Sequence, residues 1–376
     1  MHIIYFFTYG YSLKTWKDSG QLDREIKHFE ALHEKNNNLT FTLITYGDYE
    51  EINYLDKEFI NVVPFYRYKN NSKWKFIRFI NSFSVIALFN NYDFNDSQLI
   101  IQNQLLGSWV AYKFKIKLKI PIIVRTGYDM YEFSILEKKS LFKRIFYKYL
   151  TLFALNISNL YTVTSSCDKN FLVKKFSNKY NSKIKIRPNW ASENNEFVNT
   201  NNILRDTKKI ISIGRLENQK NYEFIIRSLY KTNFELDIYG EGTLKKSLAE
   251  LAESLQVKVN FCGIVDNEKL LNLLRSYKYF ITSSKFEGNP KSVLEAMASG
   301  CIVLASKIKN HVEFLNNQNS ILFDNDINQL NNIFLNLNNT NYQNLIMNAY
   351  KTIESGYTLE SLVLNEINDF NMLLVK

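Results

Sequence analysis

The sequence predicts an α/β protein of two doubly wound domains, each a mainly parallel sheet covered by helices on both faces. Short apolar runs alternate with helix-period segments along the whole chain, and these runs are continuous rather than alternating, as buried parallel strands require. The pattern stops at a polar stretch near the middle and then restarts. With 376 residues, 45% of them hydrophobic, the chain can form two cores.

The first domain is expected to span residues 1–190. Its predicted strands are the runs HIIYFFTY, FTLITYG, NVVPF, QLIIQNQ, PIIVRTG, LYTVTSS and IKIRPN. The segment ASENNEFVNTNNILRDTK that follows is polar and lacks periodicity, so we interpret it as an interdomain linker.

The second domain is expected over residues 207–356. Its predicted strands are KKIISIG, FELDIYG, KVNFCG, YFITSS, CIVLAS and SILF, and its predicted helices include NYEFIIRSLYKT, LKKSLAELAESL and NEKLLNLLRSY. The last segment, residues 357–376, is an amphipathic helix that we expect to pack back on the first domain.

Composition limits the kind of protein. The net charge of +10 and the pI near 9.1 favour anionic partners, which include nucleic acid, an acidic membrane surface and phosphorylated small molecules. Three cysteines without CxxC spacing argue against a disulfide framework or a zinc site and favour a reducing cytoplasm. The N-terminus reads as a strand rather than a leader, and no uncharged apolar run is long enough to span a bilayer.

The stretch KFEGNPKSVLEAMASGCIVLAS, residues 285–306, predicts a loop, a helix and a strand. Asn289 is expected to cap the helix, Pro290 to occupy its first turn and Gly300 to end it in the left-handed conformation. Glu295 then falls on a polar line of the helix, and Glu287 lies at the carboxyl end of a strand, where open α/β sheets bind ligands.

Two interpretations of these acids remain open from spacing alone. In the first, both carboxylates accept hydrogen bonds from a hydroxyl-rich ligand whose phosphate lies at the helix N-terminus. In the second, Glu287 helps to cap the helix and Glu295 is solvated.

A second group of residues favours the ligand interpretation. KKIISIGRLENQKN places Gly214 at a strand end, followed by Arg215 and then by Lys220 just before a helix. Two cations beside a helix N-terminus can hold a diphosphate and stabilise the charge that grows on it as it leaves, although loop cations are usually plain surface residues. FELDIYGEG places Gly240 at the next strand end, in a turn that permits close approach.

With these motifs, the second half resembles the nucleotide-sugar-binding domain of glycosyltransferase family 4, whose members are retaining enzymes of the GT-B fold. SIGRLENQKN, IYGEGTLK, FCGIVDNEKL and SSKFEGNPKSVLEAMASGCIVLAS occur in the order typical of the family, closely over residues 208–325. EGNPKSVLE is similar to the family's E-x7-E motif. The resemblance implies two Rossmann-like domains facing across a cleft, and a metal-independent transfer of a sugar from a nucleoside-diphosphate sugar.

The resemblance also implies roles for individual residues. Arg215 and Lys220 would clamp the diphosphate, Glu287 would contact the hydroxyls of the donor sugar and Glu295 those of the ribose. The remaining donor-side residues would be Gly214, Gly240, Ile264, Val265, Gly288, Asn289, Pro290 and Lys291. No cofactor and no metal site are expected, because the cations would balance the pyrophosphate.

The first half resembles the family more loosely. Its strand, glycine-containing loop and helix around TYGYSLKTW fit an acceptor and phosphate side, for which the candidates are Gly10, Asn103, Thr126, Gly127 and Tyr128. Gln102, Asn103 and Gln104 could read acceptor hydroxyls or form a strand-end turn. Many relatives carry a His after the strand equivalent to PIIVRTGYDM, and this chain does not, so a step assisted by His is not expected. We interpret His2, His28, His33 and His311 as ordinary core or surface residues.

Two segments of the first half, residues 65–89 and 137–161, combine Lys and Arg with aromatic residues at helix-like spacing. Such segments can lie on the anionic inner face of a membrane, which suits an enzyme with a lipid-linked acceptor. Alternatively, their aromatic side chains belong to the core and their basic side chains form a solvated face.

The family resemblance predicts assembly of a cell-surface polysaccharide such as capsule or O-antigen. The rival functions are a GT-B epimerase or phosphorylase, a catalytically silent relative and a basic nucleic-acid-binding protein. No module typical of nucleic-acid recognition is present in the sequence, so nucleic acid is not an expected partner.

Overall fold

The computed structural model describes residues 1–67, 73–191, 205–339 and 342–374 and divides the chain into two compact units. Unit 1 comprises Met1–Arg187 and Val363–Lys376, and unit 2 comprises Pro188–Leu362. Most of the segment predicted as a linker, residues 192–204, lies outside the described residues.

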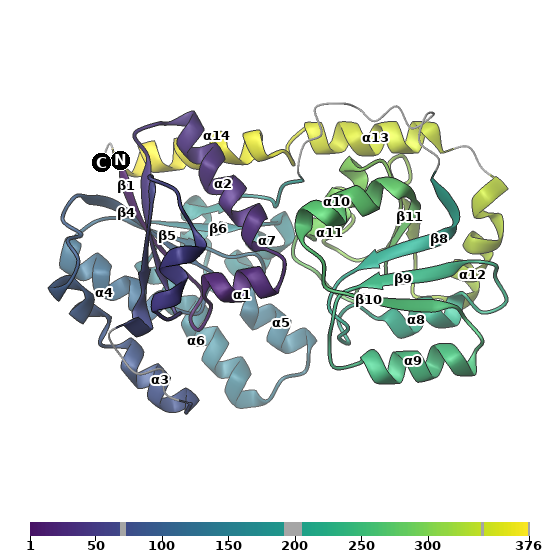
Figure 1. Cartoon of the computed structure of the whole chain (residues 1–376), viewed down its shortest axis with the longest axis horizontal. Coiled ribbons are helices and arrows are strands. Elements are labelled where there is room, and N and C mark those ends of the chain that lie inside the picture. Colours follow the sequence, from purple (N-terminus) through teal and green to yellow (C-terminus); the bar gives the residue numbers. More distant parts are fainter. Residues whose placement is uncertain (68–72, 192–204, 340–341, 375–376) are drawn as a thin grey trace. The chain divides into compact units, whose positions relative to one another are not determined.

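Unit 1 contains a parallel sheet in the order β3-β2-β1-β4-β5-β6-β7 (Figure 1). Its strands are β1 (His2–Phe6), β2 (Thr40–Thr45), β3 (Ile60–Pro64), β4 (Ser97–Asn103), β5 (Ile122–Arg125), β6 (Leu160–Val163) and β7 (Ile184–Ile186). Its helices are α1 (Leu13–Asp18), α2 (Leu22–Lys35), α3 (Lys75–Ser82), α4 (Ser108–Leu118), α5 (Met130–Leu136), α6 (Leu141–Ile157), α7 (Ser166–Lys175) and α14 (Leu359–Leu374). Each strand predicted in the first half is present.

Unit 2 contains a second parallel sheet, in the order β10-β9-β8-β11-β12-β13. Its strands are β8 (Asp206–Ile213), β9 (Glu235–Tyr239), β10 (Val259–Gly263), β11 (Tyr277–Thr282), β12 (Ile302–Ser306) and β13 (Ile321–Phe323). Its helices are α8 (Tyr222–Ser228), α9 (Lys245–Ser254), α10 (Asn267–Ser276), α11 (Lys291–Ala298), α12 (Ile327–Asn336) and α13 (Gln343–Glu354). The strands predicted in the second half are all present.

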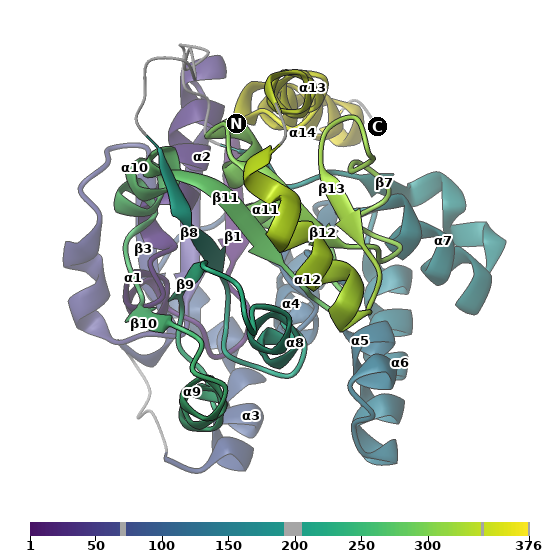
Figure 2. The same cartoon turned by 90° about the vertical axis from the view of Figure 1, so that its right-hand side faces the viewer.

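Side chains of the unit 2 strands alternate between two separate cores. On β11, Tyr279 and Ile281 pack into a cluster with α8, α9 and α12, whereas Phe280 between them packs on the other face with α10, α11 and α13. Figure 2 shows these two groups of helices on opposite faces of the sheet. Because both faces are covered, successive strand positions must all be apolar, which explains the unbroken apolar runs in the sequence.

The strand order reverses once in each sheet. In unit 1 the reversal lies between β1 and β4, and in unit 2 it lies between β8 and β11. Loops that leave two neighbouring strands at such a point run in opposite directions, so the carboxyl edge is open there. These two points are therefore the places where ligand-binding side chains are expected.

Helix α14 belongs to unit 1 from Val363 onward. Asp369, on this helix, is buried and accepts from Lys185 Nζ at 2.7 Å and from Arg187 Nε at 2.8 Å. Glu366, one turn earlier, lies 2.6 Å from His28 Nε2 and 3.8 Å from Arg125. These ion pairs fix the helix to α2, β5 and β7.

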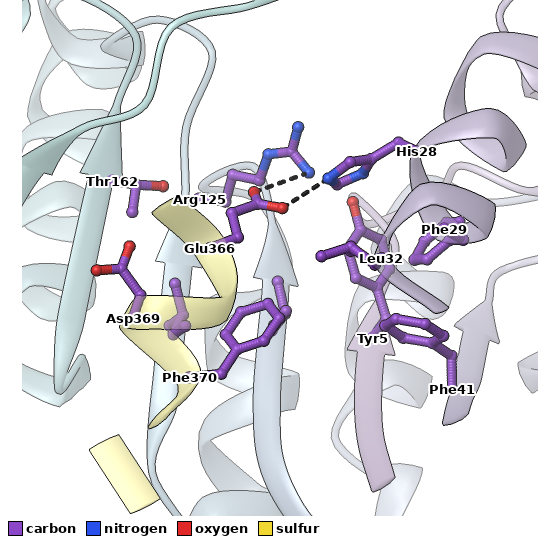
Figure 3. A pocket seen from close by; sticks show the side chains of 12 residues that line it. Tyr5, His28, Phe29, Leu32, Phe41, Arg125, Thr162, Glu366, Asp369 and Phe370 are labelled. Carbon is purple, nitrogen blue, oxygen red and sulfur yellow. Dashed lines mark hydrogen bonds and ion pairs between the residues drawn. The ribbon is translucent and has the colours of Figure 1, made fainter. Parts of the chain in front are cut away.

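Glu366 and its partners line a cavity of about 20 Å³, roughly the size of one water molecule (Figure 3). Burial would raise the pKa of Glu366, but the neighbouring His28 and Arg125 outweigh burial, and the pKa lies below its ordinary value of 4.5. A carboxylate whose pKa is lower in the folded than in the unfolded state stabilises the fold fully above the unfolded pKa. That contribution is lost as the pH falls through the folded pKa.

We therefore expect Glu366→Gln to lower the free energy of unfolding at pH 7 by about 3–5 kcal/mol, because Arg125 loses its counter-charge and His28 loses its charged hydrogen-bond partner. Urea unfolding between pH 7 and pH 3 measures this difference. It should begin to shrink as the pH falls below the ordinary carboxyl pKa of 4.5, where the unfolded chain takes up a proton, and disappear as the pH falls through the lower folded-state pKa of Glu366. The exposed pair partner Glu250, changed to Gln, is the control and should have little effect at any pH.

Candidate functional site

The carboxyl ends of β8 and β11 form the candidate site in unit 2. The two strands pair directly, with Ile211 opposite Phe280. Gly214 and Arg215 follow β8, and the loop that carries Glu287 follows β11. Residues 67 or more positions apart in the chain are thereby brought to one place at the point where the strand order reverses.

A group of five polar residues occupies this place, and we call it the carboxylate–cation cluster. Its members are Arg215, Gln219, Lys220, Ser284 and Glu287. Lys220 Nζ donates to Glu287 Oε1 at 2.5 Å, and Ser284 Oγ donates to the same oxygen at 2.6 Å. Glu287 is only 8% exposed, so the two donors replace water that the carboxylate has lost.

Gln219 joins the remaining members of the cluster. Its Nε2 donates to the Phe286 carbonyl at 2.9 Å and to Glu287 Oε2 at 3.3 Å, and its Oε1 accepts from an Arg215 nitrogen at 3.4 Å. The Gln219 carbonyl also accepts from Lys285 N at 2.8 Å. One buried amide therefore ties the loop after β8 to the loop after β11.

The charge state of Glu287 follows from this environment. Burial acts to raise the pKa of Glu287, but the charge and hydrogen bond of Lys220 and the hydrogen bond of Ser284 lower it more. The net effect is a pKa below the ordinary value. Glu287 is thus a charged acceptor at neutral pH, held next to a cation.

A second line of contacts supports the cluster from β12. Ser306 Oγ donates to the Ser284 carbonyl at 2.7 Å, and His311 Nδ1 donates to the Ser306 carbonyl at 2.7 Å. His311 is fully buried, and burial lowers its pKa, so the ring is neutral at pH 7. His311 is therefore a core residue, as the sequence suggested, and one that braces the strand ends beneath Glu287.

Glycines let the ends of β8, β9 and β10 lie against one another. Gly214 N donates to the Tyr239 carbonyl, and Gly240 N donates to the Gly263 carbonyl. A Cβ on Gly240 would lie 2.1 Å from the Gly214 carbonyl oxygen, and Gly240 has a φ of 149°. The close approach predicted for this GxG turn is confirmed, and its partner is the backbone just before Arg215.

The loop EGNPK differs from its predicted form at Asn289 and at Pro290, which was expected in the first turn of the helix. The N-cap of α11 is Pro290, and no side chain caps the helix. The prediction that Asn289 caps it is wrong, because the Asn289 side-chain oxygen accepts from Asn189 N at 2.9 Å instead. Gly288 is buried, Lys291 is half-buried as the first residue of α11, and Gly300 ends the helix with a φ of 75° as predicted.

Glu295 lies in the middle of α11 and is 3% exposed, so it is not a solvated surface residue. Its Oε1 accepts from Asn267 Nδ2 at 3.1 Å, and Asn267 is the first residue of α10. Ile264 and Val265 lie between β10 and α10, with Ile264 exposed and Val265 half-buried. Glu295 is thus tied to the loop that carries these two residues.

The acceptor-side candidates lie in unit 1. Gly10 is exposed after β1, and Asn103 ends β4, where its carbonyl accepts from Thr8 Oγ1 at 3.1 Å. Gly127 and Tyr128 follow β5, with Tyr128 stacked on Phe133. Thr126 is buried and its hydroxyl donates to the Thr162 carbonyl at 3.0 Å, so its polar atom is occupied within the unit.

The glutamines that flank Asn103 form a strand-end turn. Gln102 Nε2 donates to the carbonyls of Asn103 and Leu106, and Gln104 Oε1 accepts from Gly127 N at 3.2 Å. Of the two interpretations of this segment, the structural one therefore holds for Gln102 and Gln104.

Sequence reasoning found three members of the carboxylate–cation cluster and missed two, Gln219 and Ser284. Both were adjacent to predicted features, since Gln219 directly precedes Lys220 and Ser284 ends the run YFITSS. Nothing in the spacing distinguishes them from ordinary loop polar residues, and only the pairing of β8 with β11 brings them together.

Candidate metal-binding groups and membrane-spanning helices are both absent from the residues that the structure describes. Within them, no group of three or more His, Cys, Asp or Glu residues could hold a metal ion. The same ranges contain no helix whose length and apolar character would suffice to cross a bilayer. Metal independence stays a prediction.

The second unit is similar to known glycosyltransferases. Residues 193–352 match a family model described as "Glycosyl transferases group 1". A segment of 113 residues is 34% identical to an uncharacterized glycosyltransferase of Methanocaldococcus jannaschii, and covers 29% of this chain and 28% of that protein.

Another relative comes from Campylobacter jejuni. It is the N-acetylgalactosamine-N,N'-diacetylbacillosaminyl-diphospho-undecaprenol 4-alpha-N-acetylgalactosaminyltransferase, 34% identical over 107 residues, which cover 27% of this chain and 29% of that enzyme. The match thus spans less than a third of the length of either curated relative.

Among solved structures, sucrose-phosphate synthase from Thermosynechococcus elongatus superposes with a TM-score of 0.81 and 15% identity, covering 100% of both chains. The chain has the same GT-B architecture of two Rossmann-like units with parallel sheets, so the predicted fold class is confirmed.

Gly240→Ala should lower the free energy of unfolding by on the order of 2 kcal/mol, because its Cβ has no room beside the Gly214 carbonyl and its φ is unfavourable. Gly356→Ala is the matched control, since nothing lies within 4 Å of the added Cβ. Urea unfolding of both variants measures the difference. Equal stability of the two would contradict the close approach of β8 and β9.

Proposed function

We propose that this protein is a retaining glycosyltransferase of family 4 type, which moves a hexosyl group from a nucleoside-diphosphate sugar to a hydroxyl of a glycan or lipid-linked acceptor. The observation that carries the proposal is the carboxylate–cation cluster at the β8/β11 reversal point. The similarity of residues 193–352 to group 1 glycosyl transferases supports it.

The cluster has the chemistry that such a donor requires. Glu287 is an ionised acceptor for sugar hydroxyls, and Lys220 lies beside it as a donor that a phosphate oxygen can share. Arg215 is exposed after β8, where its guanidinium can reach a second phosphate. Its contact with Gln219 keeps it within the cluster until the diphosphate binds.

The other donor-side residues are assigned by their resemblance to the family's motifs. Glu295 would accept from the ribose hydroxyls, and Ile264 and Val265 would border the base. Gly214 and Gly240 keep the strand ends free of side chains, and the loop from Gly288 to Lys291 would lie against sugar and phosphate. On the acceptor side, we assign Gly10, Asn103, Gly127 and Tyr128 to the contact surface and Thr126 to its support.

The reaction needs no nucleophile from the protein. The bond between the sugar C1 and the phosphate oxygen breaks, the acceptor oxygen bonds to C1 on the same face, and the acceptor proton passes to the leaving diphosphate. Arg215 and Lys220 would stabilise the negative charge that develops on that diphosphate, and Glu287 would fix the sugar ring. This mechanism involves neither a metal ion nor a cofactor.

The names of the relatives support a proposed setting. The enzyme from C. jejuni is named for an acceptor joined to diphospho-undecaprenol, a lipid carrier. We propose a similar lipid-linked or glycan acceptor here, in cell-surface polysaccharide assembly such as capsule or O-antigen. The proposed location is the cytoplasm at the inner face of the membrane.

The proposal is tested by incubating the protein with a panel of nucleotide sugars and measuring free nucleoside diphosphate, with and without acceptor. We expect release that depends on acceptor, persists in EDTA and gives a product of unchanged anomeric configuration by NMR. Conversion of the donor without an acceptor would indicate an epimerase, and the absence of any turnover or donor binding would refute the proposal.

Arg215→Ala should lower turnover at least 100-fold with little change in thermal stability, because its side chain is exposed and its loss removes charge from the leaving group. Arg227→Ala, an exposed cation on α8, is the matched control and should keep full turnover. Equal turnover of the two variants would remove the diphosphate assignment.

Lys220→Ala should lower turnover to a similar extent and also destabilise the fold, because Glu287 is then buried without its counter-charge. The double variant Lys220→Ala/Glu287→Gln, compared with Glu287→Gln alone, separates the two effects. It should recover thermal stability, measured by circular dichroism, while turnover stays low. Recovery of turnover in the double variant would show that Lys220 acts only through stability.

A further inference from the structure

Two helices of unit 1 expose large apolar side chains to solvent. On α6, Phe142 is 85% exposed. Trp74, directly before α3, is 74% exposed, and Phe76 on α3 is 72% exposed. The other exposed large apolar residues of these segments are Ile77, Ile80, Phe83, Leu136, Leu141, Ile145, Phe146 and Tyr149. The alternative that the aromatics of these segments are core is therefore wrong for these positions.

The same part of unit 1 contains many cations and few acids. Its exposed acid Glu137, in the turn before α6, pairs with Lys139 at 2.6 Å. Residues 73–92, 97–128 and 138–167, which include α3, α4 and α6, contain no Asp or Glu. Cations that are exposed or half-buried there are Lys73, Arg78, Lys113, Lys117, Lys119, Lys138, Lys143, Arg144 and Lys148. A surface that is both apolar and predominantly basic is unusual for a chain in which charged residues make up 22% of the sequence.

The three helices pack against one another, and we call their exposed side chains together the α3–α6 surface. Trp109 on α4 donates through Nε1 to Ser82 Oγ at 2.9 Å and contacts Phe79 of α3. Tyr112 on α4 contacts Phe153 of α6 edge to face. In both views, α3 and the turn between α5 and α6 extend from unit 1 in the same direction (Figures 1 and 2).

The chain order places this surface next to the acceptor side. Helix α3 follows β3, and α6 follows β5 through α5, so both helices begin near the carboxyl edge of the sheet. The most exposed apolar residues, Trp74, Phe76 and Phe142, lie at these beginnings. The acceptor-side residues Gly10 and Tyr128 follow the carboxyl ends of strands in the same sheet.

We propose that the α3–α6 surface docks unit 1 onto an anionic lipid membrane. Basic residues around exposed aromatic and aliphatic side chains are what an interfacial helix presents to acidic headgroups and acyl chains. The inference deepens the proposed function by placing the acceptor side at the bilayer, and only that link rests on the proposed function.

Two other occupants fit the surface less well. In a symmetric interface with a second copy the same patch would meet itself, which places many cations opposite cations with few acids to pair them. A nucleic acid would satisfy the charge and stack on aromatic rings, but it offers no apolar partner to Leu141, Ile145 or Ile80. Lipid satisfies both the charge and the apolar area.

The test is co-sedimentation of the full chain with vesicles of phosphatidylcholine alone or with one quarter phosphatidylglycerol. We expect binding to the anionic vesicles only, weakened by salt. The variant Trp74→Ser/Phe76→Ser/Leu141→Ser/Phe142→Ser should reduce that binding at least tenfold, as should Lys143→Glu/Lys148→Glu.

Matched controls come from unit 2. Leu335→Ser/Met347→Ser removes exposed apolar residues, and Lys246→Glu/Lys269→Glu reverses exposed cations, so both should bind vesicles as the wild type does. Thermal melting checks that every variant folds. Equal vesicle binding by the quadruple variant and its control would overturn the inference.

Three further outcomes would also overturn it. The first is that the protein does not bind anionic vesicles. The second is that it binds single-stranded RNA more tightly than vesicles at the same salt concentration. The third is that ultracentrifugation shows a dimer that the quadruple variant abolishes. Diphosphate release from a nucleotide sugar with a soluble acceptor, measured without vesicles, should be unchanged in the quadruple variant. If vesicle binding fails while this release persists, the docking inference falls and the proposed function stands.

Discussion

The candidate site depends on one electrostatic constraint, which is the burial of the Glu287 carboxylate. A carboxylate removed from water is strongly destabilised unless a charge and hydrogen-bond donors replace the water. Lys220 and Ser284 supply them at 2.5 and 2.6 Å, from the loops after β8 and β11. Because both loops must supply donors to Glu287, this side chain fixes the two loops relative to each other. A ligand that binds there must compete with Glu287 for Lys220 and Ser284.

Several features of unit 2 serve to hold that arrangement. Gln219 joins the two loops, Ser306 and His311 support the β11 loop from β12, and Gly240 lets β9 approach the backbone before Arg215. Because these contacts are made by buried groups within unit 2, the cluster is formed before any ligand binds. Such preorganisation is what electrostatic stabilisation of a leaving diphosphate would require.

In unit 1, buried ion pairs attach the C-terminal helix α14 to the sheet. Glu366 and Asp369 fix α14 to the sheet through His28, Arg125, Lys185 and Arg187, which buries these charges away from the α3–α6 surface. The helices α3, α4 and α6 themselves contain no Asp or Glu, so they carry an excess of positive charge. The high net charge of the chain is in this way concentrated on one part of unit 1.

The sequence by itself determined the sheets, because strands covered on both faces must be apolar at successive positions, as Tyr279, Phe280 and Ile281 are. It also indicated Arg215, Lys220 and Glu287, since charged residues just after buried strands fall at the carboxyl edge. Only the tertiary structure decided that Gln219 and Ser284 join them, that Asn289 bonds Asn189 rather than the helix, and that Phe142 and Trp74 face solvent. These outcomes depend on which strands are neighbours and on what packs over each helix, and such long-range contacts leave no periodic signal in the chain.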